Sequence, residues 1–132
     1  MRNLLLIFIL SFILGACTSK PILNISNEYI PTNTSGAQKS LKEVENIILK
    51  AAKERGWSPR VVEPGLIEAS ISVRSHRATI EIPYSEAKYS INYKDSVNLN
   101  ATSTKIHRNY NNWIVRLSRT IQQQLGVSTQ NY

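Results

Sequence analysis

The stretch "LIEASISVRSHRATIEIPYSEAKYSINYK", from Leu66 to Lys94, decides the fold, because apolar and polar residues alternate along most of it. This period of two is typical of β-strands that bury one face and expose the other. Polar residues interrupt the alternation near positions 75–76 and 85–87 and divide the stretch into three strands. The pattern therefore predicts an antiparallel sheet with one apolar face.

The same alternation predicts how the strands pair. A two-residue turn at Ser75 and His76 places every apolar residue opposite another apolar residue, and a slip by one residue would reverse the faces. A shorter strand from Arg60 to Val62 is expected to add a fourth strand. The predicted pairs are Val73–Ala78, Ile71–Ile80, Ala69–Ile82 and Ile67–Tyr84 in the first hairpin, and Tyr84–Tyr89, Ile82–Ile91 and Ile80–Tyr93 in the second.

An amphipathic helix is predicted on either side of the strands. The first begins at Ser40, which forms a capping box with Glu43, and ends at Gly56. The second is expected to begin at Thr104 as its N-cap and to end at Gly126. Their apolar stripes are Leu41, Val44, Ile47, Ile48 and Ala51 in the first helix, and Ile106, Tyr110, Trp113, Ile114, Leu117, Ile121 and Leu125 in the second.

These elements predict an α+β fold. The expected arrangement is a two-layer sandwich in the order α-β-β-β(-β)-α, with an antiparallel sheet of three or four strands and both helices on its apolar face. We expect one domain over residues 37–126, followed by a short tail over 127–132.

The first seventeen residues are typical of an export signal. Arg2 precedes the apolar run Leu4–Leu14, which is shorter than the ~20 residues that a bilayer span needs. The run ends in Leu14, Gly15, Ala16 and Cys17, which resembles the lipobox of bacterial lipoproteins. The resemblance implies that the Cys17 thiol receives a diacylglyceryl group and that residues 1–16 are removed. An ordinary signal or an uncleaved apolar anchor with a chance cysteine is the alternative.

Residues 17–36 are expected to form a flexible tether, because Pro, Ser, Thr and Asn are frequent there without a sustained period. Thr18, rather than Asp, follows the cysteine. By resemblance to lipoprotein sorting signals, this favours the outer membrane over the inner membrane, with the domain facing the periplasm. Cys17 has no second cysteine with which to form a disulfide.

A second resemblance lies in the domain. Pro64-Gly65 before a strand, the Tyr-Ser-Ile-x-Tyr run at 89–93, Ser-x-Asn-Leu at 96–99 and Ile-His-x-x-Tyr-Asn-x-Trp at 106–113 are similar to a family of small uncharacterised proteobacterial lipoproteins. The resemblance covers most of residues 56–121. It implies an envelope location and adds no catalytic residue.

The net charge of +7 favours an anionic partner. An exported and anchored domain meets little nucleic acid, so we expect acidic lipid headgroups or envelope polymers rather than DNA or RNA. The candidate binding residues are Arg74, His76 and Arg77 at the hairpin tip, with Lys94 opposite Thr79 on the polar face. The plainer alternative is a solvated turn, in which Arg74 and Arg77 face and repel each other.

A second candidate cluster lies at the start of the last helix, where backbone N–H groups attract anions. The alternative is that its aromatic residues are core and its amides face water. The cluster consists of His107, Asn109, Tyr110, Asn111, Asn112 and Trp113.

The sequence gives little reason to expect catalysis, a metal or a cofactor. Two distant histidines fall short of a metal site, and no phosphate-binding loop or nucleophile elbow occurs. Ser75, His76 and Glu81 could form a hydrolase triad only on paper.

Two functions of different class remain. The first is a membrane-anchored binding or assembly module for another envelope protein. The second is a binder of an anionic small ligand, lipid headgroup or peptidoglycan fragment.

Overall fold

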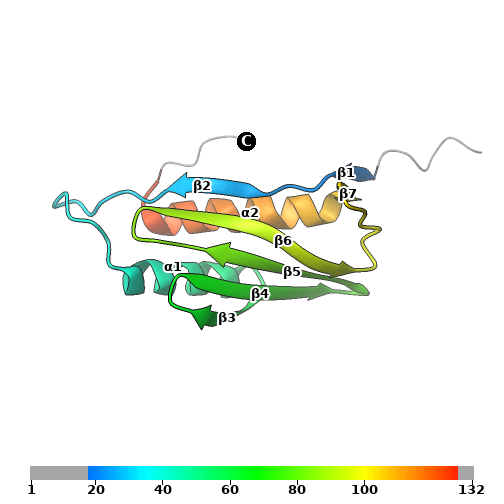
Figure 1. Cartoon of the computed structure of the whole chain (residues 1–132), viewed down its shortest axis with the longest axis horizontal. Coiled ribbons are helices and arrows are strands. Elements are labelled where there is room, and N and C mark those ends of the chain that lie inside the picture. The colour runs from blue at the N-terminus through cyan, green and yellow to red at the C-terminus, as the bar shows by residue number, and fades with distance from the viewer. Residues whose placement is uncertain (1–17, 128–132) are drawn as a thin grey trace, which may run out of the picture.

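A computed structural model describes residues 18–127 (Figure 1). It contains two helices and two antiparallel sheets, so the α+β prediction is confirmed. The order of elements is β-β-α-β-β-β-β-β-α, which adds strands that the sequence did not predict. The elements are β1 Ser19–Pro21, β2 Ile25–Tyr29, α1 Leu41–Glu54, β3 Ser58–Glu63, β4 Leu66–Val73, β5 His76–Pro83, β6 Lys88–Val97, β7 Lys105–His107 and α2 Arg108–Leu125.

The larger sheet has five strands in the order β2-β6-β5-β4-β3, rather than the predicted three or four. The three predicted long strands are its centre, and β3 contains the predicted strand near Arg60 to Val62. The second predicted hairpin register is confirmed at two of its pairs, Ile80 with Tyr93 and Tyr84 with Tyr89.

The predicted register of the first hairpin is wrong by two residues. Val73 pairs with His76 and Ile71 pairs with Ala78, so the turn consists of Arg74 and Ser75. A shift of two residues leaves each side chain on its predicted face, because the side-chain period of a strand is two. The hydrophobic pattern therefore remains satisfied in both registers.

The segment that was expected to be a flexible tether contains two strands. β1 pairs with β7, and β2 pairs with β6 at one edge of the larger sheet. Ile25 and Ile30 are buried in the core, and the Ile22 N–H donates to the Thr104 carbonyl at 3.0 Å. The described part of residues 17–36 is thus tied to the fold through backbone pairing and buried isoleucines.

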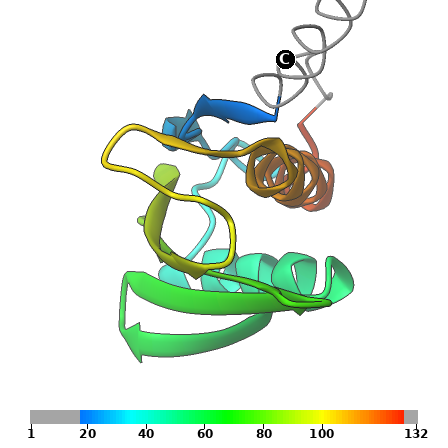
Figure 2. The same ribbon diagram turned by 90° about the vertical axis from the view of Figure 1, so that its right-hand side faces the viewer.

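Both helices lie on the same side of the curved sheet, as Figure 2 shows. The capping box of Ser40 and Glu43 at α1 is confirmed, and Gly56 and Gly126 follow the helices with φ of +82° and +83°. The predicted start of the second helix at Thr104 is wrong. Residues 105–107 form β7, and His107 is the N-cap of α2.

One apolar core joins the two layers. Ile67, Ile80 and Ile91 from the sheet and Ile48 and Ile114 from the helices have no exposed surface. Deleting such a side chain costs about 2–5 kcal/mol of stability. Neither helix of residues 18–127 combines the length and the apolar character that crossing a membrane requires.

Candidate functional site

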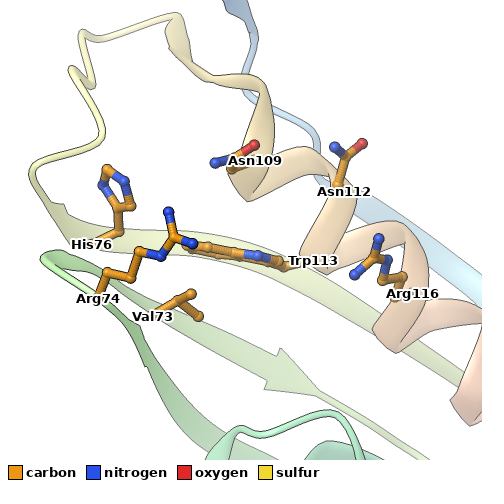
Figure 3. A pocket seen from close by; sticks show the side chains of 7 residues that line it. All are labelled: Val73, Arg74, His76, Asn109, Asn112, Trp113 and Arg116. Atoms are coloured by element: carbon orange, nitrogen blue, oxygen red, sulfur yellow. The ribbon is translucent and has the colours of Figure 1, made fainter.

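A pocket of about 270 Å³ lies between the β4–β5 turn and the first turns of α2. Figure 3 shows its side chains, with the Trp113 ring between Arg74 and Arg116 in this view. The pocket joins residues from the two clusters that the sequence suggested separately. Its lining consists of Val73, Arg74, His76, Asn109, Asn112, Trp113 and Arg116.

Asn98, in the loop between β6 and β7, holds the β4–β5 turn in place through two hydrogen bonds. The Asn98 side-chain amide donates to Ser75 Oγ at 2.8 Å, and its backbone carbonyl accepts from His76 Nδ1 at 2.7 Å. Arg74 has a φ of +56°, in the left-handed region that favours glycine. The turn therefore holds an arginine at a position where its backbone is strained.

The other wall of the pocket is one face of α2. Asn109, Asn112, Trp113 and Arg116 share this face, because residues three and four apart are neighbours on a helix. The His107 Nδ1 accepts from the Asn109 backbone N–H at 3.2 Å and fixes where the helix begins. The His107 ring also stacks on that of His76, with centroids 6.2 Å apart, and so connects the two walls.

The charge of the pocket comes from Arg74 and Arg116, and none of the acidic residues in the described part of the chain lines it. Within residues 18–127, neither guanidinium has a hydrogen-bond or ion-pair partner. Guanidinium groups bind carboxylates and phosphates through paired N–H donors. The arrangement can therefore hold an anionic group beside the half-buried Trp113 ring.

A second, smaller pocket of about 170 Å³ adjoins the first and shares Trp113 and Arg116 with it. Arg55 and Glu54 from the end of α1 line this pocket too. Arg55 Nε donates to Thr120 Oγ1 at 2.6 Å, and Glu54 accepts from the Gln124 amide at 2.6 Å. This pocket has mixed charge, which makes the first pocket the better anion site.

Lys94 was predicted to lie opposite Thr79 in the basic rim, and this position is wrong. A register shift between Thr79 and Ile80 places Asp95, not Lys94, opposite Thr79. The Lys94 ammonium pairs with Glu68 and, at 3.1 Å, with Glu81. The hydrogen bond to Glu68 and, to a smaller extent, the hydrogen bond to Glu81 raise the pKa of Lys94. The positive charge of Lys94 is therefore paired with carboxylates of the sheet.

Arg77 also lies outside the pocket. It pairs with Ser72 across the hairpin and donates from Nε to Ser72 Oγ at 3.4 Å. The expected repulsion between Arg74 and Arg77 as directly opposed residues is therefore wrong, because Arg74 belongs to the turn. Of the four predicted rim residues, the structure brings Arg74 and His76 together in the pocket.

The cluster at the start of α2 divides between two roles. Tyr110 is fully buried, and this burial raises the pKa of its hydroxyl. The Asn111 side chain turns to the N-terminal segment, where it accepts from the Leu23 N–H at 3.0 Å and donates to the Pro21 carbonyl at 2.9 Å. Asn109, Asn112 and Trp113 are the members that line the pocket.

Ser75, His76 and Glu81 are not arranged as a hydrolase triad. The hydrogen bonds described above engage Ser75 Oγ and His76 Nδ1 with Asn98, while Glu81 pairs with Lys94. In the described part of the chain, no three His, Cys, Asp or Glu side chains are grouped as metal ligands. Cys17 and the lipobox residues Leu14, Gly15 and Ala16 lie outside the described residues.

Comparison with known proteins gave no family model, curated protein or solved structure that matches this chain.

Proposed function

We propose that this protein is an envelope lipoprotein, anchored through Cys17, that binds an anionic group in the pocket between Arg74 and Arg116. The observation that carries the proposal is a pair of arginines beside Trp113 that have no hydrogen-bond or ion-pair partner within residues 18–127, in a pocket that no acidic residue of this range lines. The strained backbone of Arg74 supports it, because strain at an exposed residue is retained where the side chain has a use. The protein acts by binding and not by catalysis.

The pocket is tested by titration with inorganic phosphate and with acetate, followed by NMR at the side-chain amides of Asn109 and Asn112. We expect saturable shifts of both amides. Arg74→Gln and Arg116→Gln should each weaken binding about tenfold or more, because a hydrogen bond to a charged group contributes about 1.5–3 kcal/mol. Arg119→Gln is the matched control, since Arg119 is on the same helix but does not line the pocket. Non-saturable shifts, or equal loss in the control, would reject the pocket.

The anchor is tested on the mature protein by mass spectrometry of its amino terminus. We expect a diacylglyceryl group on Cys17 and release of the protein from membranes in the Cys17→Ser variant. A mature chain that begins elsewhere without a lipid would contradict the anchor and leave the pocket to be judged by its own titration.

A protein partner is the second candidate function. β3 is an edge strand of the five-stranded sheet, and its Val61 and Val62 are 40% and 44% exposed. An open edge with apolar side chains can accept a strand from another protein. A photo-crosslinker at Val62 should then give one discrete adduct in cells that persists in high salt, and Val61→Lys should remove it.

A further inference from the structure

The net charge of residues 18–127 is unevenly distributed along the long axis of the molecule. Three segments, 18–22, 73–77 and 96–109, contain five Lys and Arg and no Asp or Glu, and the exposed Asp95 directly precedes the third segment. All five side chains are exposed. They are Lys20, Arg74, Arg77, Lys105 and Arg108.

Backbone pairing and side-chain contacts bring the three segments together. Lys20 pairs with Ile106 in the small sheet, and the Arg108 N–H donates to the Thr18 carbonyl at 2.8 Å. The His76–Asn98 hydrogen bond and the stack of His76 on His107 join the β4–β5 turn to the same group. The segments form the end of the molecule that lies to the right in Figure 1 and faces the viewer in Figure 2. We call it the basic end.

The opposite end carries both signs of charge. Glu28, Glu43, Glu63 and Glu86 lie in or beside the elements that meet there, together with Lys42 and Lys88. Lys42 forms an ion pair with Glu45 at 2.5 Å. The net positive charge of the described chain is therefore concentrated at the basic end.

The chain enters the fold at the basic end. Thr18 is the first described residue, and its carbonyl accepts a hydrogen bond from the N–H of Arg108, the first residue of α2. Cys17 is its covalent neighbour, so a lipid attached there lies within one residue of this end. Because β1 begins at Ser19, little chain remains between the attachment point and the fold.

We propose that the basic end lies against the anionic lipid headgroups of the membrane that holds the anchor, and that a headgroup phosphate is the anion bound between Arg74 and Arg116. This inference rests on the proposed function for both the anchor and the pocket. A basic residue near an anionic bilayer strengthens association roughly fivefold. Five such residues next to one anchor orient the domain as well as retain it.

The test uses the full lipidated protein reconstituted in phosphatidylcholine vesicles, with or without phosphatidylglycerol. Acylation of Cys17 leaves an introduced cysteine as the one free thiol for a fluorophore. Ser103→Cys marks the basic end and Ser35→Cys marks the far end; both serines are exposed. Spin-labelled headgroups serve as the quencher.

We expect strong quenching at position 103 and weak quenching at position 35, only when phosphatidylglycerol is present. The difference should decrease severalfold in high salt and in the double variant Lys105→Gln/Arg108→Gln. The matched double variant Lys50→Gln/Lys88→Gln removes two charges outside the basic end and should keep the difference. Equal quenching at positions 103 and 35, or quenching that is the same with and without phosphatidylglycerol, would overturn the inference.

A parallel titration with soluble glycerol phosphate separates the two proposals. If it shifts the Asn109 and Asn112 amides but the labels show no orientation, the membrane inference is wrong and the pocket stands. If neither experiment gives a signal, the inference and the proposed anion pocket are both wrong.

Discussion

Two regions of the molecule hold basic residues in opposite ways. On the open face of the sheet, Glu68 accepts from Lys94 and, at 2.8 Å, from Arg60, and these hydrogen bonds, that with Lys94 first, lower the pKa of Glu68. At the pocket, Arg74 and Arg116 have no such partner among the described residues. A basic residue therefore indicates a binding site only where the fold has not already neutralised it.

The sharpest test of this comparison is Arg74→Gly. Because Arg74 has a φ of +56° in a two-residue turn, glycine should raise the free energy of unfolding by about 0.5–1 kcal/mol. The same change should reduce phosphate affinity about tenfold or more, since it removes a charged donor. Denaturant unfolding and the NMR titration measure the two effects. Lower stability with unchanged affinity would mean that Arg74 is kept for the turn alone.

The next effect concerns the helix start that supports the pocket. His107→Ala removes the N-cap acceptor of the Asn109 N–H and should lower the free energy of unfolding by about 1 kcal/mol. His107→Asn retains an acceptor and should recover most of that loss. Chemical denaturation measures both, and hydrogen exchange at the first turn of α2 locates the change. An equal loss in the two variants would show that the ring stack with His76, not the cap, matters.

The ion pairs of Glu68 with Arg60 and Lys94 should make the free energy of unfolding depend on pH. Since the folded pKa of Glu68 lies below its unfolded value of about 4.3, its pairing stabilises the fold above that pH. The stabilisation is lost as the pH falls through the folded pKa. Glu68→Gln should therefore make the acid-side decline in the free energy of unfolding shallower. Glu63→Gln, on the exposed edge strand, is the matched control, and an identical decline in wild type and Glu68→Gln would refute the assignment.

The smallest expected effect is that of Lys94→Gln, which should leave the phosphate affinity of the pocket essentially unchanged. Lys94→Gln removes one positive charge, but that charge is paired with Glu68 and Glu81 and does not line the pocket. Phosphate affinity, measured by the same titration, should remain within about twofold of wild type, because a screened surface charge acts weakly at a distance. A tenfold loss would erase the distinction between the two regions.

Local patterns predicted most of the fold. Alternation located the three central strands, and the capping box at Ser40 and the glycines at 56 and 126 marked helix ends correctly. The pattern could not choose between registers two residues apart, because both bury the same faces. It also missed β2, in which Ile25 is the one buried residue of five, so no period was visible. Ile106 fitted the helical spacing of α2 but is buried in β7.

The candidate site was predicted in two unconnected parts. The sequence suggested Arg74 with His76 and, separately, Asn109 with Trp113, but their adjacency depends on how the β4–β5 turn meets α2. Arg116 was missed, although its spacing from Asn112 and Trp113 places it on their helical face. Arg77 and Lys94 do not line the pocket, because alternation and a local register shift direct them to other partners.

The pairing of the N-terminal strands has a consequence for the order in which the chain folds. β1 and β2 pair with β7 and β6, which lie 59 or more residues later in the sequence. Contacts this distant form slowly, since a long loop must close first. The central hairpins can form early from neighbouring strands, whereas β1 and β2 remain unpaired until β7 and β6 are available. A chaperone that shields these strands during folding would protect the protein at the stage when it is most prone to aggregate.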